Sequence, residues 1–265
     1  MLGMAEVVHY YFDGSMTGLL SCVFRAFQFK EFDVELALYG GSQHGLFATT
    51  IDVPSNEQQA GRVWSALGQR ISASSLKQFY FAYFSESLEA YQHLFTYCLY
   101  IFRSKNRVEK NYMHPSVLAI AQWAKKVGRE KHRMEAFVRF KKTDDGLFLS
   151  LVRPDFNVLP LIQPHFKRRY QDQRWLIYDE QRDYGIYYDL HDVHEVSLTA
   201  KEIDATLDIG SSQRFSIELD EQELLYDQLW KDYFASINIK ERKNVKLHVQ
   251  YLPKRYWRYL NEKLV

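Results

Sequence analysis

The sequence has few of the residues from which metal centres and disulfide frameworks are built. It contains only 2 cysteines, Cys22 and Cys98, and no Cys-x-x-Cys or Cys/His array. Both lie in apolar segments, so we expect buried, reduced thiols rather than a disulfide. A structural zinc site or an iron–sulfur cluster held by this chain alone is disfavoured, and we expect no cofactor.

Phosphate-binding glycine motifs and long apolar runs are also missing. No G-x-G-x-x-G and no G-x-x-x-x-G-K-[ST] occurs, which argues against nucleotide hydrolysis. The longest apolar stretch, residues 94–102, is far shorter than a helix that spans a bilayer. The first residues lack the basic start and apolar core of a signal peptide. We therefore expect a cytoplasmic protein without membrane association.

What is present predicts a globular chain with a sizeable core. Of the 265 residues, 46% are hydrophobic and 16% are aromatic. The aromatic residues have two interpretations, a ring-rich core and rings exposed for stacking. The length fits one domain over 1–265, which can carry a C-terminal helical subdomain from about residue 200.

Hydrophobic periodicity predicts an α+β fold, in which a mixed or antiparallel sheet packs with several helices and the C-terminal part is helical. Helices are predicted over 16–30, 74–84 and 88–103, after the capping box of Ser55 and Gln58, from Pro115 onwards, and around 164–173. Strands are predicted over 6–12, 136–142, 147–153, 174–179 and 184–189. The segments 34–40 and 46–53 are expected to pair across a Gly-rich turn.

The C-terminal third predicts further helices. Helix starts are expected at 199–202 and 220–223, the second with Leu219 and Leu224 as a hydrophobic staple. A last helix is expected after Pro253.

Charge is segregated although the whole chain carries a net charge of only +1. Residues 125–174 hold 13 Lys/Arg against 6 Asp/Glu, a net charge of +7. Residues 175–232 hold 4 against 15, a net charge of −11, and residues 239–265 hold 8 against 2, a net charge of +6. Two basic segments thus flank an acidic one.

The basic segments interleave cations with aromatic rings, a mixture that suits nucleic acid because cations neutralise phosphates and rings stack on bases. The competing interpretation is that the acidic segment neutralises the basic ones within the chain. The candidate DNA-binding residues are Arg129, His132, Arg133, Phe137, Arg139, Lys141, Arg168, Arg169, Trp175, Lys254, Arg255, Tyr256, Trp257 and Arg258.

Candidates for proton transfer exist but form no specific motif. They are Asp13, Glu130, His132, Asp155, His165 and Asp172, of which we keep His132, Asp155 and His165 as catalytic candidates. Asp13 suits a turn better than catalysis. His191, His194 and Glu195 could hold a metal only if their segment turns, since in a strand the two histidines point to opposite sides, so we expect no metal site.

Residues 132–142 and the segment "LVRPDFNVLPLIQPHFKRRYQDQRWLIYDEQRDYGIYYD" resemble a bacterial family of DNA metabolism or DNA repair proteins of unknown function. Residues 11–27 near the start and 252–262 near the end are similar to it too. The resemblance implies a radical S-adenosylmethionine partner suspected of DNA modification or repair. In other bacteria a similar domain is fused to a uracil-DNA glycosylase-like domain. It supplies no catalytic residue to carry over.

Three hypotheses follow. The first is a DNA-binding protein of repair or modification that holds DNA while a radical S-adenosylmethionine protein does the chemistry, since two cysteines cannot supply the three thiolates of such a cluster. The second is an enzyme that acts on a damaged base, which needs an enclosed pocket. The third is a protein–protein adaptor that never touches DNA.

Overall fold

The computed structural model describes residues 8–40, 49–144, 146–197, 207–209, 213–215 and 252–260. The chain divides into two compact units, residues 1–128 (unit 1) and residues 129–265 (unit 2). Such a division does not say whether one unit folds without the other, so the single-domain expectation stays a prediction. In the described residues, no helix is long and apolar enough to cross a membrane.

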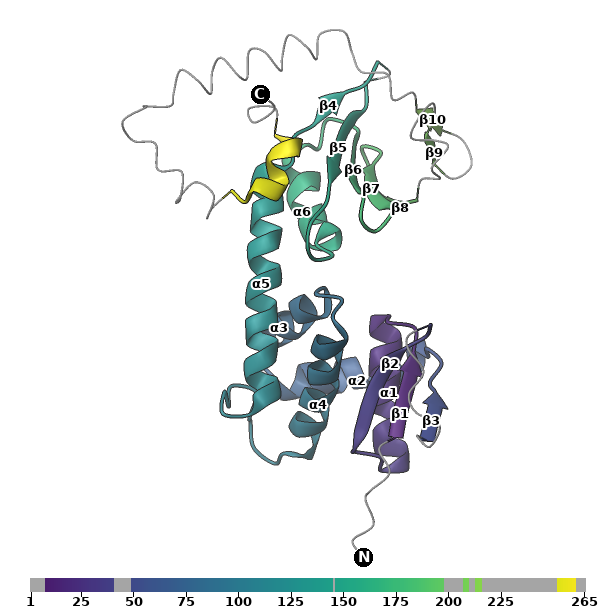
Figure 1. Cartoon of the computed structure of the whole chain (residues 1–265), viewed down its shortest axis with the longest axis vertical. Coiled ribbons are helices and arrows are strands. Elements are labelled where there is room, and N and C mark those ends of the chain that lie inside the picture. The colour runs from purple at the N-terminus through teal and green to yellow at the C-terminus, as the bar shows by residue number, and fades with distance from the viewer. Residues whose placement is uncertain are drawn as a thin grey trace, which may run out of the picture. The chain divides into compact units, whose positions relative to one another are not determined.

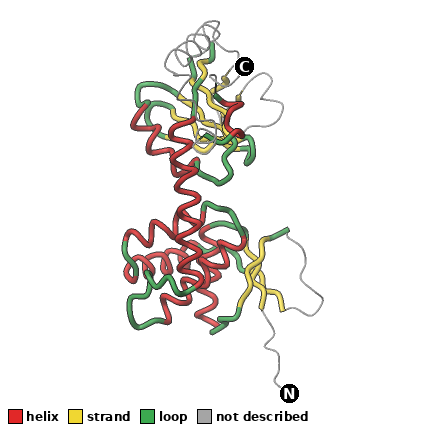
Figure 2. Tube along the Cα trace, turned by 60° about the vertical axis from the view of Figure 1, so that its left-hand side comes forward, coloured by secondary structure: helices red, strands yellow, loops and turns green. Residues whose placement is uncertain are grey.

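Unit 1 combines a small parallel sheet with helices. Its elements are β1 (Val8–Phe12), α1 (Met16–Phe29), β2 (Val34–Leu38), β3 (Thr49–Asp52), α2 (Glu57–Arg70), α3 (Ala73–Tyr83), α4 (Leu88–Arg103) and the first part of α5 (Pro115–Phe137). The strand order is β2-β1-β3, and both outer strands run parallel to β1. Figures 1 and 2 show the helices of this unit gathered to one side of the sheet.

This sheet corrects one strand prediction. The segments expected to pair across a turn become β2 and β3, but each pairs with β1, which lies between them. The physical reason is burial, because Tyr10 and Phe12 of β1 are fully buried and make it the natural central strand. Helix α1 provides the crossover that a parallel β1–β2 pair requires.

The core of unit 1 follows the predicted stripe of α4. Tyr91, Leu94, Phe95, Cys98 and Leu99 are all buried, as their helical spacing indicated. Both cysteines of the chain are buried free thiols, which confirms that prediction.

The turn after β1 shows how local chemistry starts the first helix. Ser15 caps α1 by accepting a hydrogen bond from the Gly18 amide at 2.8 Å. Asp13 accepts hydrogen bonds from the hydroxyls of Ser15 and Ser55, at 2.6 and 2.7 Å. Ser55 is therefore engaged with Asp13, and the cap of α2 is Asn56, whose side chain accepts from the Gln59 amide. The N-cap of α2 is thus one residue later than predicted, and the Asn56 amide donates to the Ser21 hydroxyl instead of closing a capping box.

Unit 2 is built on a five-stranded mixed sheet in the order β4-β5-β6-β7-β8. Its elements are the rest of α5, β4 (Lys141–Lys142), β5 (Phe148–Val152), α6 (Leu159–Arg169), β6 (Trp175–Asp179), β7 (Tyr184–Tyr188), β8 (Val193–Val196), β9 (Leu207–Ile209), β10 (Gln213–Phe215) and the 3-10 helix η2 (Lys254–Tyr259). Only β5 and β6 are parallel among the paired strands of this sheet, and α6 connects them. The α+β class is therefore confirmed.

Two predictions in unit 2 change. The strand expected over 136–142 shrinks to Lys141–Lys142, because α5 continues through Phe137 and the Val138 amide still bonds the Met134 carbonyl at 3.1 Å. In the C-terminal part, the described residues form the β9–β10 pair and η2, which takes the place of the helix expected after Pro253. The helix starts at 199–202 and 220–223 lie outside the described residues.

Replacing Asn56 by Ala should lower the free energy of unfolding by about 1 kcal/mol, because the Gln59 amide loses its acceptor at the start of α2. Gln58→Ala is the matched control, since Gln58 is exposed and should change stability by less than about 0.5 kcal/mol. Urea denaturation measures both. Equal losses for the two variants would contradict the assignment of Asn56 as the cap.

Candidate functional site

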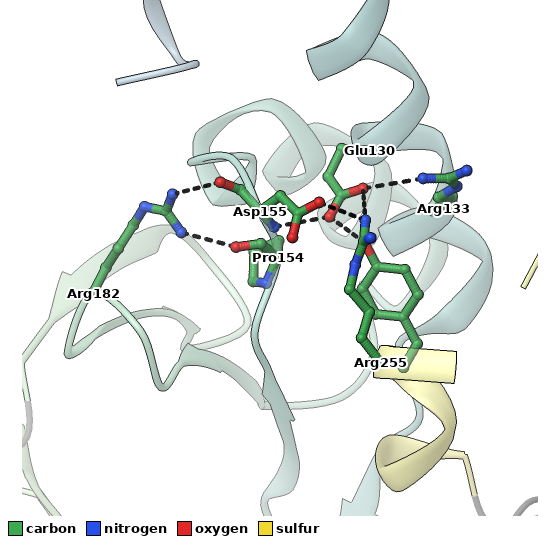
Figure 3. A network of polar contacts seen from close by, with 7 residues as sticks. Glu130, Arg133, Pro154, Asp155, Arg182 and Arg255 are labelled. Carbon is green, nitrogen blue, oxygen red and sulfur yellow. Dashed lines mark hydrogen bonds and ion pairs between the residues drawn. The ribbon is translucent and has the colours of Figure 1, made fainter. Parts of the chain in front are cut away.

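A buried carboxylate lies at the centre of a polar cluster in unit 2. Glu130 of α5 is only 1% exposed. Its carboxylate accepts a hydrogen bond from the Tyr256 hydroxyl and one from the Asp155 backbone amide at 2.9 Å. The guanidinium groups of Arg255 and Arg133 lie 3.3 and 3.6 Å from it. Figure 3 shows these groups converging on Glu130.

A second carboxylate extends the cluster towards solvent. The side chain of Asp155, in the segment after β5, lies 2.6 Å from the Arg255 guanidinium. Arg182, in the β6–β7 turn, donates to the backbone carbonyls of Pro154 and Asp155 at 3.2 and 3.3 Å (Figure 3). It also donates to the fully buried Asp179 at 2.8 Å. We call the residues Glu130, Arg133, Asp155, Asp179, Arg182, Arg255 and Tyr256 the Glu130 network.

The Glu130 network balances its own charge, with three carboxylates against three guanidinium groups. A buried carboxylate is tolerated when it is paired and hydrogen-bonded, and Glu130 has both kinds of partner. Burial, together with the hydrogen bond to Glu130 and the charge of Glu130, raises the pKa of Tyr256 above its usual range. Burial also raises the pKa of Asp179, although hydrogen bonds from Gln181 and Arg182 and the charge of Arg182 oppose that shift. These groups therefore join α5, η2, the segment after β5 and the β6–β7 turn.

The structure removes several residues from the predicted DNA-binding surface. Trp175 and Tyr256 are each 1% exposed, so their rings are not available to stack on bases. Arg133 and Arg255 form ion pairs with Glu130. Arg139 donates to the backbone carbonyls of Ala136, in the last turn of α5, and of Val138, just after it.

Other predicted residues remain exposed. Arg129 and His132 lie on α5, Arg168 and Arg169 end α6, and Lys254 begins η2. None of the five belongs to an ion pair within the part of the chain that the structure describes. We call the arginines and the lysine among them the exposed cations of unit 2.

Four further candidates have smaller or undescribed roles. Phe137 is half-buried and packs on Tyr256 with ring centroids 5.8 Å apart. Trp257 is half-buried and donates its indole N–H to the Leu252 carbonyl at 3.1 Å. Lys141 is half-buried in β4. The side chain of Arg258 lies outside the described residues.

The catalytic candidates do not assemble into a catalytic constellation. Asp155 is paired with Arg255, and His165 lies 3.7 Å from Glu135 of α5. His132 is exposed. The cavity beside Tyr256, lined also by Met134 and Phe137, has a volume of about 10 Å³, room for one water and not for a base.

The histidine pair considered for a metal serves a turn instead. His194 Nε2 lies 2.9 Å from an Asp189 oxygen, and the other oxygen of Asp189 accepts from the His191 and Asp192 amides. Among the described residues, no three His, Cys, Asp or Glu side chains gather as a metal site.

Sequence reasoning listed Glu130 among possible proton-transfer residues but missed its structural role. It also missed Arg182 and Asp179. The spacing of Asp179 and Arg182 across a turn suggests an ion pair. No local signal links Glu130 to Tyr256, because 126 positions separate them in the chain.

This geometry defines the class of protein. It is an α+β chain with a charge-balanced polar network and a set of exposed cations. Residues 89–262 match the model of a protein family described as a domain of unknown function, DUF4130. The match covers about two thirds of the chain, which therefore belongs to this family. The comparisons with curated proteins and with solved structures found no match.

Replacing Glu130 by Gln should lower the free energy of unfolding by about 2 kcal/mol, because the buried side chain loses the charge that pairs with Arg133 and Arg255, although Arg255 keeps Asp155. Tyr256→Phe should cost about 1–2 kcal/mol, and the double variant should cost less than the sum. Urea denaturation of the four proteins completes the cycle. Strict additivity would mean that the two side chains do not interact in solution.

Stability should depend on Asp189 in acid. Amides of Asp192 and His191 and the His194 ring hold the pKa of Asp189 below its usual range. A depressed pKa stabilises the folded state above the ordinary aspartate pKa of about 4, and this contribution is lost as pH falls. Asp189→Ala should therefore lower the Tm at pH 6 and differ less from the wild type as pH drops below about 4. A Tm difference that stays constant with pH would contradict this assignment.

Proposed function

We propose that the protein binds DNA in a repair or modification process and acts beside a radical S-adenosylmethionine partner. The observation that carries the proposal is the contrast within unit 2. Arg133, Arg182 and Arg255 form ion pairs with carboxylates of the same unit. In contrast, Arg129, Arg168 and Arg169 are exposed and belong to none of the described ion pairs. Exposed cations that have no ion-pair partner among the described residues are available to phosphates.

The end of α6 is the strongest part of this surface. Lys167, Arg168 and Arg169 occupy its last turn, where they face the negative end of the helix dipole. Lys167 pairs with Asp192 at 3.1 Å. The Arg168 Nε donates to the Pro164 carbonyl at 3.1 Å, and Arg169 lies over the Tyr170 ring. Both contacts hold the stems and leave terminal N–H groups for phosphate oxygens.

Division of labour with a partner is consistent with the cysteines. Cys22 and Cys98 are both buried, and two thiols are too few for the cluster of a radical S-adenosylmethionine enzyme. The resemblance noted from residues 132–142 and 151–189 supports the same assignment.

Replacing Arg168 and Arg169 by Ala should weaken DNA binding and lower the slope of log K against log salt by about 2, one for each lost phosphate contact. Fluorescence anisotropy with labelled duplex DNA across a salt series measures this.

The matched control is Lys77→Ala with Lys126→Ala, which removes two exposed cations that rest on the rings of Phe81 and Trp123 in unit 1, away from the end of α6. Its slope should stay near the wild-type value. Equal slopes for both double variants would remove the end of α6 from the surface. A wild type that binds the radical partner but no DNA at low salt would favour the adaptor hypothesis.

A further inference from the structure

Three helices of unit 1 line an open groove with an aromatic interior. Its volume is about 670 Å³. The lining residues are Phe24, Phe27 and Gln28 of α1, Arg62, Val63 and Ala66 of α2, and Phe102 of α4. The three phenylalanines are only half-buried, and the rings of Phe27 and Phe102 meet edge to face with centroids 5.7 Å apart. Rings that remain partly open in a groove offer stacking surface.

Arginines lie over the rings of this groove and of its margin. The guanidinium carbon of Arg62 is 5.2 Å from the centroid of the Phe24 ring. Arg103 is 4.6 Å from the centroid of Phe32, which packs edge to face on Phe27 at 5.5 Å. A guanidinium that rests on a ring keeps its N–H donors free at its edge, where they can meet an anion.

Two more cations lie near the ends of α2 and α4. Arg70, at the end of α2, donates to the Ser104 carbonyl at 3.0 Å and so lies beside the end of α4. Lys105 follows Ser104 in the chain and is exposed. Together with Arg62 and Arg103, these cations take part in none of the ion pairs described in unit 1, which are His9–Glu35, Arg25–Glu31 and His93–Glu89.

We propose that this groove is a binding site for single-stranded DNA, with bases against the open faces of the phenylalanine rings and phosphates on Arg62, Arg70, Arg103 and Lys105. An aromatic floor with a cationic margin is the combination by which proteins hold single strands without reading sequence. A duplex fits less well, because its bases are stacked on one another and their faces are not open to the phenylalanine rings. The inference rests on the proposed function for its ligand class, but it uses other residues in the other unit.

An acidic peptide is the main competitor for such a surface. The apolar part of the groove is short, with three phenylalanines, one valine and one alanine, whereas a docked helix needs anchors over two turns or more. Four cations beside so small an apolar floor suit a ligand with regularly spaced charges better than one with scattered carboxylates.

The first test uses the full chain with both substitutions, Arg62→Gln and Arg103→Gln. It measures the binding of this double variant to an oligothymidylate of about 12 nucleotides. Glutamine keeps most of the stem over each ring and removes the charge. Binding of the oligothymidylate should weaken roughly tenfold and the salt slope should fall by about 2, with little change on duplex DNA.

The control is Lys77→Gln with Lys126→Gln. It removes two cations that also rest on rings of unit 1, those of Phe81 and Trp123, outside the groove. This control should bind like the wild type. If the Arg62/Arg103 variant bound the oligothymidylate like the control, the inference would be overturned.

The second test places a photo-crosslinking residue at Gln28 in the groove, with the exposed Glu89 as the control position. Crosslinking to oligothymidylate at Gln28 and not at Glu89 supports the proposal. Crosslinking to polyglutamate in preference to oligothymidylate overturns it in favour of an acidic protein partner.

Failure of the inference and failure of the proposed function can be told apart by the two double variants. If the Arg168/Arg169 variant loses both duplex and single-strand binding and the Arg62/Arg103 variant loses neither, the proposed function stands and the groove is rejected as a binding site. The opposite pattern retains the groove and removes the end of α6.

Discussion

Keeping the carboxylate of Glu130 out of water is the constraint on which the described part of unit 2 depends. An unpaired buried charge costs several kcal/mol, so the surrounding segments must supply partners. The segment after β5 supplies the Asp155 amide, η2 supplies Arg255 and Tyr256, and α5 itself supplies Arg133. Segments far apart in the chain are therefore joined at one point, and η2 is held against α5 by polar rather than apolar contacts alone.

The same constraint explains why a basic sequence does not become a uniformly basic surface. Six cations stand in residues 129–142, but Arg133, Lys131 and Arg139 meet Glu130, Glu135 and a carbonyl in the last turn of α5. What remains for a polyanion is the smaller set of exposed cations. Charge counted along a chain thus overestimates the charge available to a partner, since pairing is decided in three dimensions.

Unit 1 organises charge in another way. Its arginines at the groove rest on aromatic rings instead of on carboxylates, so they keep their full charge while their stems are held in place. The two units therefore offer different surfaces, a flat set of cations at the end of a helix and a groove with an aromatic floor. We expect the first to contact phosphates and the second to accept bases as well.

The sequence by itself determined what local spacing controls. The buried stripe of α4, the cap of α1 by Ser15, the strands β6 and β7 and the buried cysteines all follow from periodicity or short-range hydrogen bonds. The α+β class followed from the same patterns. Of the candidate site, the sequence indicated the basic segments and several residues that are exposed cations.

Only the tertiary structure decided which of those residues are free. Trp175 and Tyr256 became core, the β2–β3 pair gave way to two pairs with β1, and Glu130 found partners up to 126 positions away. The physical reason is that burial and ion pairing depend on which segments meet. Which segments come into contact is decided by the competition of whole segments for the core. Local residue patterns do not determine these contacts.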